Sequence, residues 1–214
     1  QAIFNGLNQY ALFVFQWGFR PAAPQVQDLF TAMFLHAGLA HLVMNGLGLF
    51  IVGRLVESSF GHLRFLIIYL LAGLFGSVAS FGFNTVAVGA GASGAIFGTL
   101  GALAAFFAVN RDSFGKEGRQ SLVGVLMVAG LVLASGIQTE EVDNWAHLGG
   151  FIIGGLVGIG LVPPLRGMRH TASVNIDNKS RSTAYTSVSR ISVSMLTAFL
   201  VFAIAMWIGN GRLY

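Results

Sequence analysis

The charged residues of this chain are so unevenly placed that six long stretches contain no Asp, Glu, Lys or Arg. A helix that crosses the hydrocarbon core of a bilayer needs roughly 20 predominantly apolar residues. Five stretches fit one such helix each. The sixth, 65–110, has 46 residues and fits two helices around a glycine-rich break near 82–91. The charge-free stretches are 1–19, 29–53, 65–110, 120–139, 144–165 and 191–211.

Composition narrows the class of protein further. Only 9% of the 214 residues are charged and 55% are hydrophobic, whereas a typical soluble domain has about 25% charged residues. So few charges exclude a soluble monomer, and so apolar a chain excludes disorder. The absence of Cys excludes a disulfide scaffold. We therefore predict an all-α, polytopic helical bundle embedded in a lipid bilayer.

The predicted helices divide the chain into three parts. A core over 1–162 is followed by a polar cytoplasmic linker over 163–190 and by an extra C-terminal transmembrane helix within 191–214. Asn and Gln side chains interrupt the first stretch, 1–19, so we expect a short or truncated first helix there. The remaining helices are expected at 36–54, 64–83, 93–110, 120–138, 145–162 and 191–209.

The distribution of Lys and Arg predicts how the bundle is oriented in the membrane. If the loops alternate between the two sides, ten of the twelve basic residues fall on one side, in 54–64, 111–119 and 166–190. An excess of Lys and Arg marks the cytoplasmic side of a membrane protein, so these loops are predicted to be cytoplasmic. They also account for the basic pI, and no nucleic-acid partner is expected. A multi-pass protein of a bacterial plasma membrane is the default prediction.

Four polar residues interrupt the apolar helices at one predicted depth, below the outer surface. His41 and Asn45 are four residues apart and share a helix face. Ser93 begins one predicted helix, and His147 lies about one turn into another. A serine beside a neutral imidazole is the minimum nucleophile–base unit. The His41 and Asn45 side chains can donate hydrogen bonds to a developing oxyanion.

Each of these residues also has a purely structural interpretation. His41 and Asn45 can form interhelical hydrogen bonds, and Ser93 can cap its helix. Most glycines, including the four-residue spacing of Gly150, Gly154 and Gly158, are expected to serve close helix packing. A metal site at His36 and His41 lacks Cys or an intramembrane carboxylate to complete it. No metal or other cofactor is therefore expected.

Four motifs resemble those of the rhomboid intramembrane serine proteases, over residues 31–162. They are His36-Ala-Gly-Leu-Ala-His41-Leu-Val-Met-Asn45, Gly53-x-x-x-Glu57-x-x-x-Gly61, Gly91-Ala-Ser93-Gly-Ala-Ile-Phe97-Gly98 and Trp145-Ala-His147-Leu-Gly-Gly150. The resemblance implies a core of six helices, here with a seventh after it. It also implies hydrolysis of transmembrane protein substrates by intramembrane proteolysis.

The resemblance assigns a role to each matched residue. It implies a catalytic dyad of Ser93 and His147 without an acidic third member, so Asp143 is not expected to take part. His41 and Asn45, with the Ser93 amide, would form the oxyanion hole. His36 would be structural, and Phe97 would stack on the dyad histidine.

The sequence departs from the family at Gln27-Asp28, where Trp-Arg is usual. Glu57 and the two glycines around it are expected to form a loop after the second helix.

Two alternatives remain open. A catalytically silent relative would bind transmembrane clients without cleaving them, although such relatives usually lose the serine or the histidine. A transporter or channel would place polar residues along a full pathway and usually repeat one half of the chain. Here the polar residues stop in the outer half and no repeated half is visible.

Overall fold

The computed structural model describes residues 9–20, 23, 25–83, 88–137 and 142–163, and their regular secondary structure is helical apart from one isolated β-bridge. A 3-10 turn spans Ala32–Phe34 and a π turn spans Leu49–Gly53. The predicted all-α bundle is confirmed. Its helices are α1 (Gln9–Trp17), α2 (Asp28–Thr31), α3 (Leu39–Gly48), α4 (Arg54–Phe60), α5 (His62–Phe83), α6 (Ser93–Val109), α7 (Arg111–Ile137) and α8 (Asn144–Leu161).

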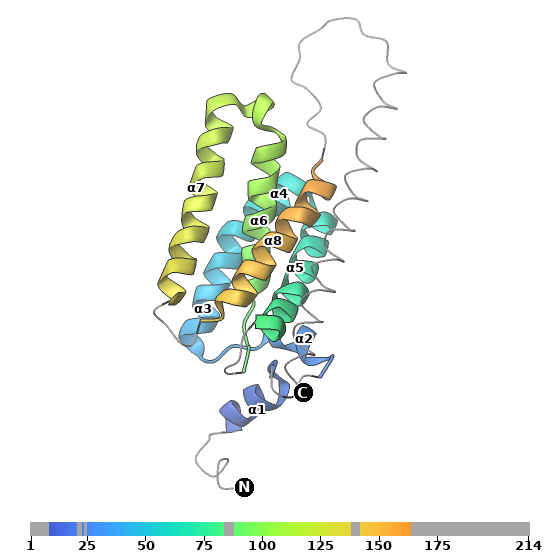
Figure 1. Ribbon diagram of the computed structural model, residues 1–214, viewed down its shortest axis with the longest axis vertical. Helices are drawn as coiled ribbons and strands as arrows, with labels where there is room; N and C mark the ends of the chain where they lie inside the picture. Colours follow the sequence, from blue (N-terminus) through green and yellow to red (C-terminus); the bar gives the residue numbers. More distant parts are fainter. Residues whose placement is uncertain (1–8, 21–22, 24, 84–87, 138–141, 164–214) are drawn as a thin grey trace, which may run out of the picture.

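Four of the described helices are long and apolar enough to cross a membrane. They are Leu39–Phe60, which joins α3 and α4 through the π turn, His62–Phe83, Arg111–Ile137 and Asn144–Leu161. They run alongside one another around the shorter apolar helix Ser93–Val109 (Figure 1). The chain is thus a multi-pass membrane protein, as its charge-free stretches predict.

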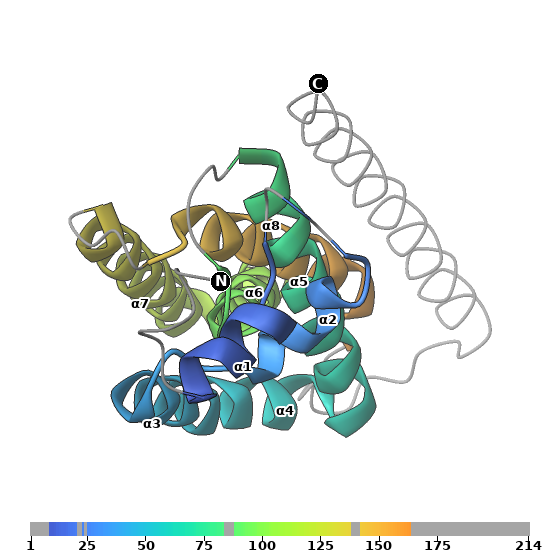
Figure 2. The same ribbon diagram turned by 90° about the horizontal axis from the view of Figure 1, so that it is seen from below.

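Helix α6 is the centre of the bundle. It has α3 with α4, α5, α7 and α8 around it when the bundle is seen along its length (Figure 2). Thirteen of its seventeen residues are buried. Small side chains make this possible, because Gly, Ala and Thr let neighbouring helix backbones approach closely.

Glycines bring the backbones of α6 and α8 into direct contact. A Cβ atom on Gly154 would lie 2.0 Å from the carbonyl oxygen of Gly98, and one on Gly150 would lie 2.0 Å from that of Gly94. A Cβ on Gly158 would lie 2.8 Å from Ala102 Cα. The expected packing role of this four-residue spacing is confirmed, and it sets how deep α8 lies beside α6.

The loops predicted at 54–64 and 111–119 are wrong, because the structure is mostly helical in both segments. The second span continues through Glu57 to Phe60, and Gly61, at φ 85°, makes the turn into α5. The segment 111–119 belongs to α7 and is helical on both sides of Gly115, where non-helical backbone (φ 56°, ψ −130°) makes a sharp kink. The charges at these places mark the end of the apolar stretch, but Arg, Lys and Glu are themselves good helix formers. A change in polarity therefore does not end a helix.

The structure describes part of the first predicted helix but not the last one. Helix α1 has nine residues, about 14 Å of helix, which is shorter than the roughly 30 Å hydrocarbon core. A short first helix is therefore what the described residues contain. The linker from residue 164 onward and the helix predicted at 191–209 lie outside the described residues.

The α6–α8 contact predicts that two glycine substitutions differ in their effect on stability. Gly154→Ala should lower the stability of the folded protein by about 1–3 kcal/mol, since the backbone of α6 must move to admit the methyl group. Gly130→Ala on α7 is the matched control, because nothing lies within 4 Å of its added Cβ. Thermal unfolding in detergent measures both, and equal melting temperatures would contradict this account of the packing.

Candidate active site

Ser93 is the first residue of α6, and the backbone before it is held on two sides. The amide of Phe19 donates to Gly89 O at 2.8 Å, and the amide of Gly89 donates back to Phe19 O at 2.7 Å. The amide of Gly91 donates to Ala32 O at 2.8 Å. The segment 88–92 is here called the nucleophile segment. It is therefore bound to the stretch between α1 and α3, here called the first loop.

Gly91 brings the nucleophile segment against α3. Its φ of 134° favours glycine, and a Cβ there would lie 2.8 Å from His41 Nε2 and 3.8 Å from Asn45 Nδ2. The two polar residues predicted on α3 thus border the backbone that leads directly into Ser93. Only a glycine permits this approach.

The hydrogen bonds of His41 fix which ring nitrogen carries its proton. The amide of Ala37 donates to His41 Nδ1 at 3.3 Å. Nδ1 is therefore an acceptor, and a neutral ring carries its proton on Nε2, the nitrogen that faces Gly91. Asn45, which is buried, donates from Nδ2 to His41 O at 3.0 Å. This bond uses one of the two N–H groups of the amide.

His147 lies on the side of α6 that carries Ser93. Its ring is buried and stacks on Phe97, with the ring centroids 4.2 Å apart and the planes 4° from parallel. Phe97 is four residues after Ser93, so the two share a helix face. A Cβ on Gly94 would lie 3.3 Å from Ala146 O, so the neighbours of Ser93 and His147 also touch. The expected aromatic stack is present.

The carboxylate of Asp143 forms hydrogen bonds with groups other than the His147 ring. One carboxylate oxygen accepts the amide of Ala146 at 3.0 Å and so caps α8, while the other accepts the hydroxyl of Ser80 on α5. The Nδ1 atom of His147 is buried and has no hydrogen-bond partner among the described residues. The geometry thus matches a histidine without an acidic partner.

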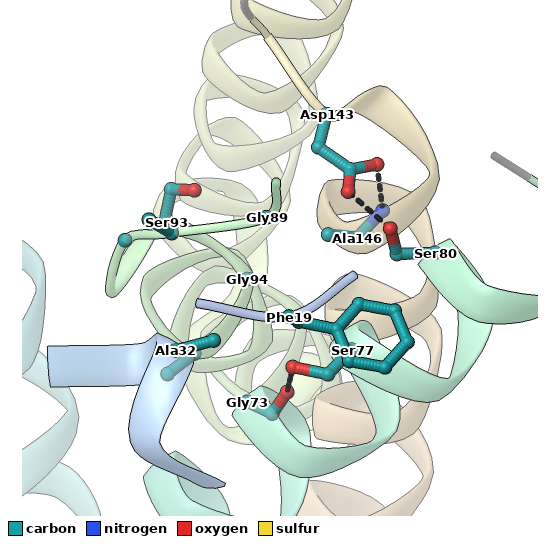
Figure 3. A pocket seen from close by; sticks show the side chains of 13 residues that line it. Phe19, Ala32, Gly73, Ser77, Ser80, Gly89, Ser93, Gly94, Asp143 and Ala146 are labelled. Carbon is teal, nitrogen blue, oxygen red and sulfur yellow. Dashed lines mark hydrogen bonds between the residues drawn. The ribbon is translucent and has the colours of Figure 1, made fainter. Parts of the chain in front are cut away.

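A small cavity opens beside Ser93. Its volume is about 40 Å³, and a buried water needs roughly 10–15 Å³ of such space. Ser93 lies at one edge of this cavity, and Ser80 and Asp143 lie across it (Figure 3). The first loop contributes Phe19 and Ala32 to its wall. Water therefore has room close to the predicted nucleophile.

His36, predicted to be structural, lies in the loop before α3. Its carbonyl oxygen accepts the hydroxyl of Tyr10 on α1, and its ring packs edge-on against the His41 ring, with centroids 5.2 Å apart. These contacts tie α1 to the start of α3, in agreement with a structural role.

Sequence reasoning missed two parts of this region. The Ser80–Asp143 hydrogen bond joins residues 63 positions apart, and Arg20 pairs with Asp28 at 3.6 Å. No local pattern reports such contacts. The one signal was Asp28 itself, an acidic residue at a place where the resemblance leads one to expect Arg.

The chain is similar to known proteins over most of its length. The family model of the Rhomboid domain matches residues 23–164. RHOMBOID-like protein 1 of Arabidopsis thaliana is 39% identical over 134 residues, which make up 63% of this chain and 34% of that protein. Rhomboid protease GluP of Bacillus subtilis is 44% identical over 126 residues, 59% of this chain and 24% of GluP. The chain thus matches a quarter to a third of these relatives.

Similarity extends to a relative whose name denotes inactivity. Inactive RHOMBOID-like protein 8 of Arabidopsis thaliana is 31% identical over 185 residues, which are 83% of this chain and 51% of that protein. A relative named a protease and a relative named inactive are therefore both similar to this chain. The family-model match covers most of the chain and coincides with the bundle around α6. The chain belongs to the rhomboid family.

Proposed function

We propose that this chain is an intramembrane serine endopeptidase that cleaves transmembrane segments of membrane proteins with a dyad of Ser93 and His147. The observation that carries the proposal is the stack of His147 on Phe97, one turn below Ser93. It supports a buried, oriented imidazole on the nucleophile's side of α6. A serine with such a base close by is activated for attack on a carbonyl carbon.

The reaction has two halves. Ser93 Oγ attacks the peptide carbonyl while His147 takes its proton, and the protonated His147 then gives that proton to the leaving amine. Water opens the resulting acyl-enzyme, with His147 acting again as base. The oxyanion is held by the Nε2–H of His41, the Asn45 amide and the Ser93 N–H. The acceptor role of His41 Nδ1 supports this assignment.

Hydrolysis inside a membrane requires a supply of water. The cavity beside Ser93, with its serine and carboxylate lining, supports water at this depth. A substrate must also present extended backbone to the serine, so residues of low helix propensity near the scissile bond lower the cost of unwinding its helix.

The proposed orientation puts the active site near the outer surface. The starts of α3, α6 and α8 share one end of the bundle, and the α4–α5 and α6–α7 junctions lie at the other (Figure 1). Arg54, Arg64, Arg111, Lys116 and Arg119 lie at or beside those junctions. Their excess supports a cytoplasmic position for that end. A bacterial plasma membrane stays a prediction, since the relatives include plant proteins.

Removal of either dyad member should abolish proteolysis. Purified protein in detergent should cleave a model single-span substrate, and Ser93→Ala and His147→Ala should each reduce kcat at least about 10³-fold. Ser77→Ala is a matched control, because its hydroxyl lines the same cavity but donates to Gly73 O. Cleavage that survives Ser93→Ala would overturn the mechanism.

Asn45 should matter for the transition state more than for substrate binding. Asn45→Ala should lower kcat about 10²–10³-fold with little change in KM, as loss of an oxyanion donor does. Asn110→Ala is the control, since Asn110 makes the same bond to the carbonyl four residues back, at 2.9 Å, at the other end of the bundle. Equal losses in the two variants would point to a general loss of helix stability instead.

Asp143 should behave as a helix cap. Asp143→Asn keeps an oxygen that can cap α8, and we expect kcat to stay within about tenfold of wild type. A carboxylate that orients the catalytic histidine of a triad contributes about 10⁴-fold in kcat. Steady-state kinetics separates the two cases, and a loss near the larger value would assign Asp143 to the catalytic machinery.

A further inference from the structure

The first loop contains a buried ion pair that the proposed catalytic steps do not use. Asp28 is 1% exposed and lies 3.6 Å from the Arg20 guanidinium. Neither carboxylate oxygen has a hydrogen-bond partner among the described residues, and Arg20 Nε is buried without one as well. A buried carboxylate is costly unless a charge of opposite sign compensates it. The positive charge of Arg20 therefore compensates the negative charge of the buried Asp28 side chain.

The pair stands beside the backbone contacts that hold the nucleophile segment. Arg20 directly follows Phe19, whose backbone exchanges two hydrogen bonds with Gly89. Asp28 begins α2, which leads into Ala32, and the carbonyl of Ala32 accepts the amide of Gly91. The ion pair thus clamps together the two stretches of the first loop that bind the segment before Ser93.

Two other contacts hold the first loop together and attach it to α5. The Thr31 hydroxyl donates to Trp17 O at 2.7 Å, which joins the same two stretches a second time. The side chain of Phe19 is 1% exposed and packs edge-on against Phe81, with ring centroids 6.1 Å apart. The nucleophile segment itself has one antiparallel bridge and no sheet around it among the described residues. Its position therefore depends on the first loop.

We propose that Arg20 and Asp28 are positioning residues for the nucleophile: their ion pair holds the first loop in the geometry that places Gly89, Gly91 and hence Ser93. The proposal rests on the proposed proteolytic function. One member of the pair, Asp28, lies where the resemblance leads one to expect Trp-Arg. Neither residue contacts the reacting atoms, so both act through the backbone.

The first test removes the charge of Asp28 while keeping its shape. Asp28→Asn should lower kcat about 10–100-fold in detergent, because a displacement near 1 Å at a nucleophile costs up to this much. KM should change little. The rate at which a fluorophosphonate labels Ser93 should fall in parallel. Arg20→Lys, which keeps the positive charge, should retain most of the activity.

Asp112→Asn is the matched control. Asp112 also pairs with an arginine, Arg111, at 3.7 Å, but it is exposed and lies at the opposite end of the bundle. Rates are normalised to the folded protein at a temperature well below unfolding, so that lower stability alone does not reduce them. If Asp28→Asn labels and cleaves as fast per folded molecule as Asp112→Asn, the pair has no positioning role.

A disulfide that restores activity would distinguish a positioning role from a merely structural one. A Cβ on Gly89 would lie 3.6 Å from Phe19 Cβ, within the range of a disulfide. The chain has no Cys, so Phe19→Cys with Gly89→Cys introduces a single possible bridge. In the Asp28→Asn background, oxidation of this double variant should raise kcat several-fold over its reduced form, because the bridge restores the contact between the two segments.

The reduced form of the same protein is the control for the loss of the Phe19 side chain. Mass spectrometry verifies the bridge. Equal kcat values for the oxidised and reduced forms would overturn the proposal, as would failure of the bridge to form. The proposed function fails separately, if the wild-type protein neither cleaves the substrate nor reacts with the fluorophosphonate.

Discussion

The contact between α6 and α8 is the interaction on which the candidate site depends. Glycines on both helices let the backbones meet so closely that a Cβ on Gly150 or Gly154 would lie 2.0 Å from an α6 carbonyl oxygen. With no room for a side chain between the two helices, their axial positions are set together. Ser93 begins one helix and His147 lies one turn into the other, so the same packing brings the two residues to one level.

The remaining contacts adjust this basic arrangement. Phe97 orients the His147 ring, and Gly91 seats the nucleophile segment against His41. The amide of Ala37 fixes the His41 proton on Nε2. The first of these contacts is a stack of aromatic rings, and the other two use a glycine and a backbone amide. A site assembled in this way is held by the rigid scaffold of the bundle, as proximity catalysis requires.

Much of this arrangement is predictable from the sequence, and the reason is physical. Polar side chains are rare in apolar helices, so His41, Asn45, Ser93 and His147 stand out, and alternation of the helices puts them at one end. Helix ends were less predictable, because charge marks the membrane boundary while Gly61 and Gly115 determine where the backbone bends. The Arg20–Asp28 and Ser80–Asp143 contacts were not predictable, since they depend on how distant loops fold together.

The proposed mechanism requires Ser93 to be a nucleophile that His147 activates. The most direct measurement is the site at which a fluorophosphonate attaches to the protein, determined by peptide mass spectrometry. The account predicts a covalent phosphonyl group on Ser93 of the wild-type protein and none when His147 is replaced by Ala. No labelling under conditions that label an active rhomboid protease, or labelling at Ser77 or Ser80 instead, would contradict it.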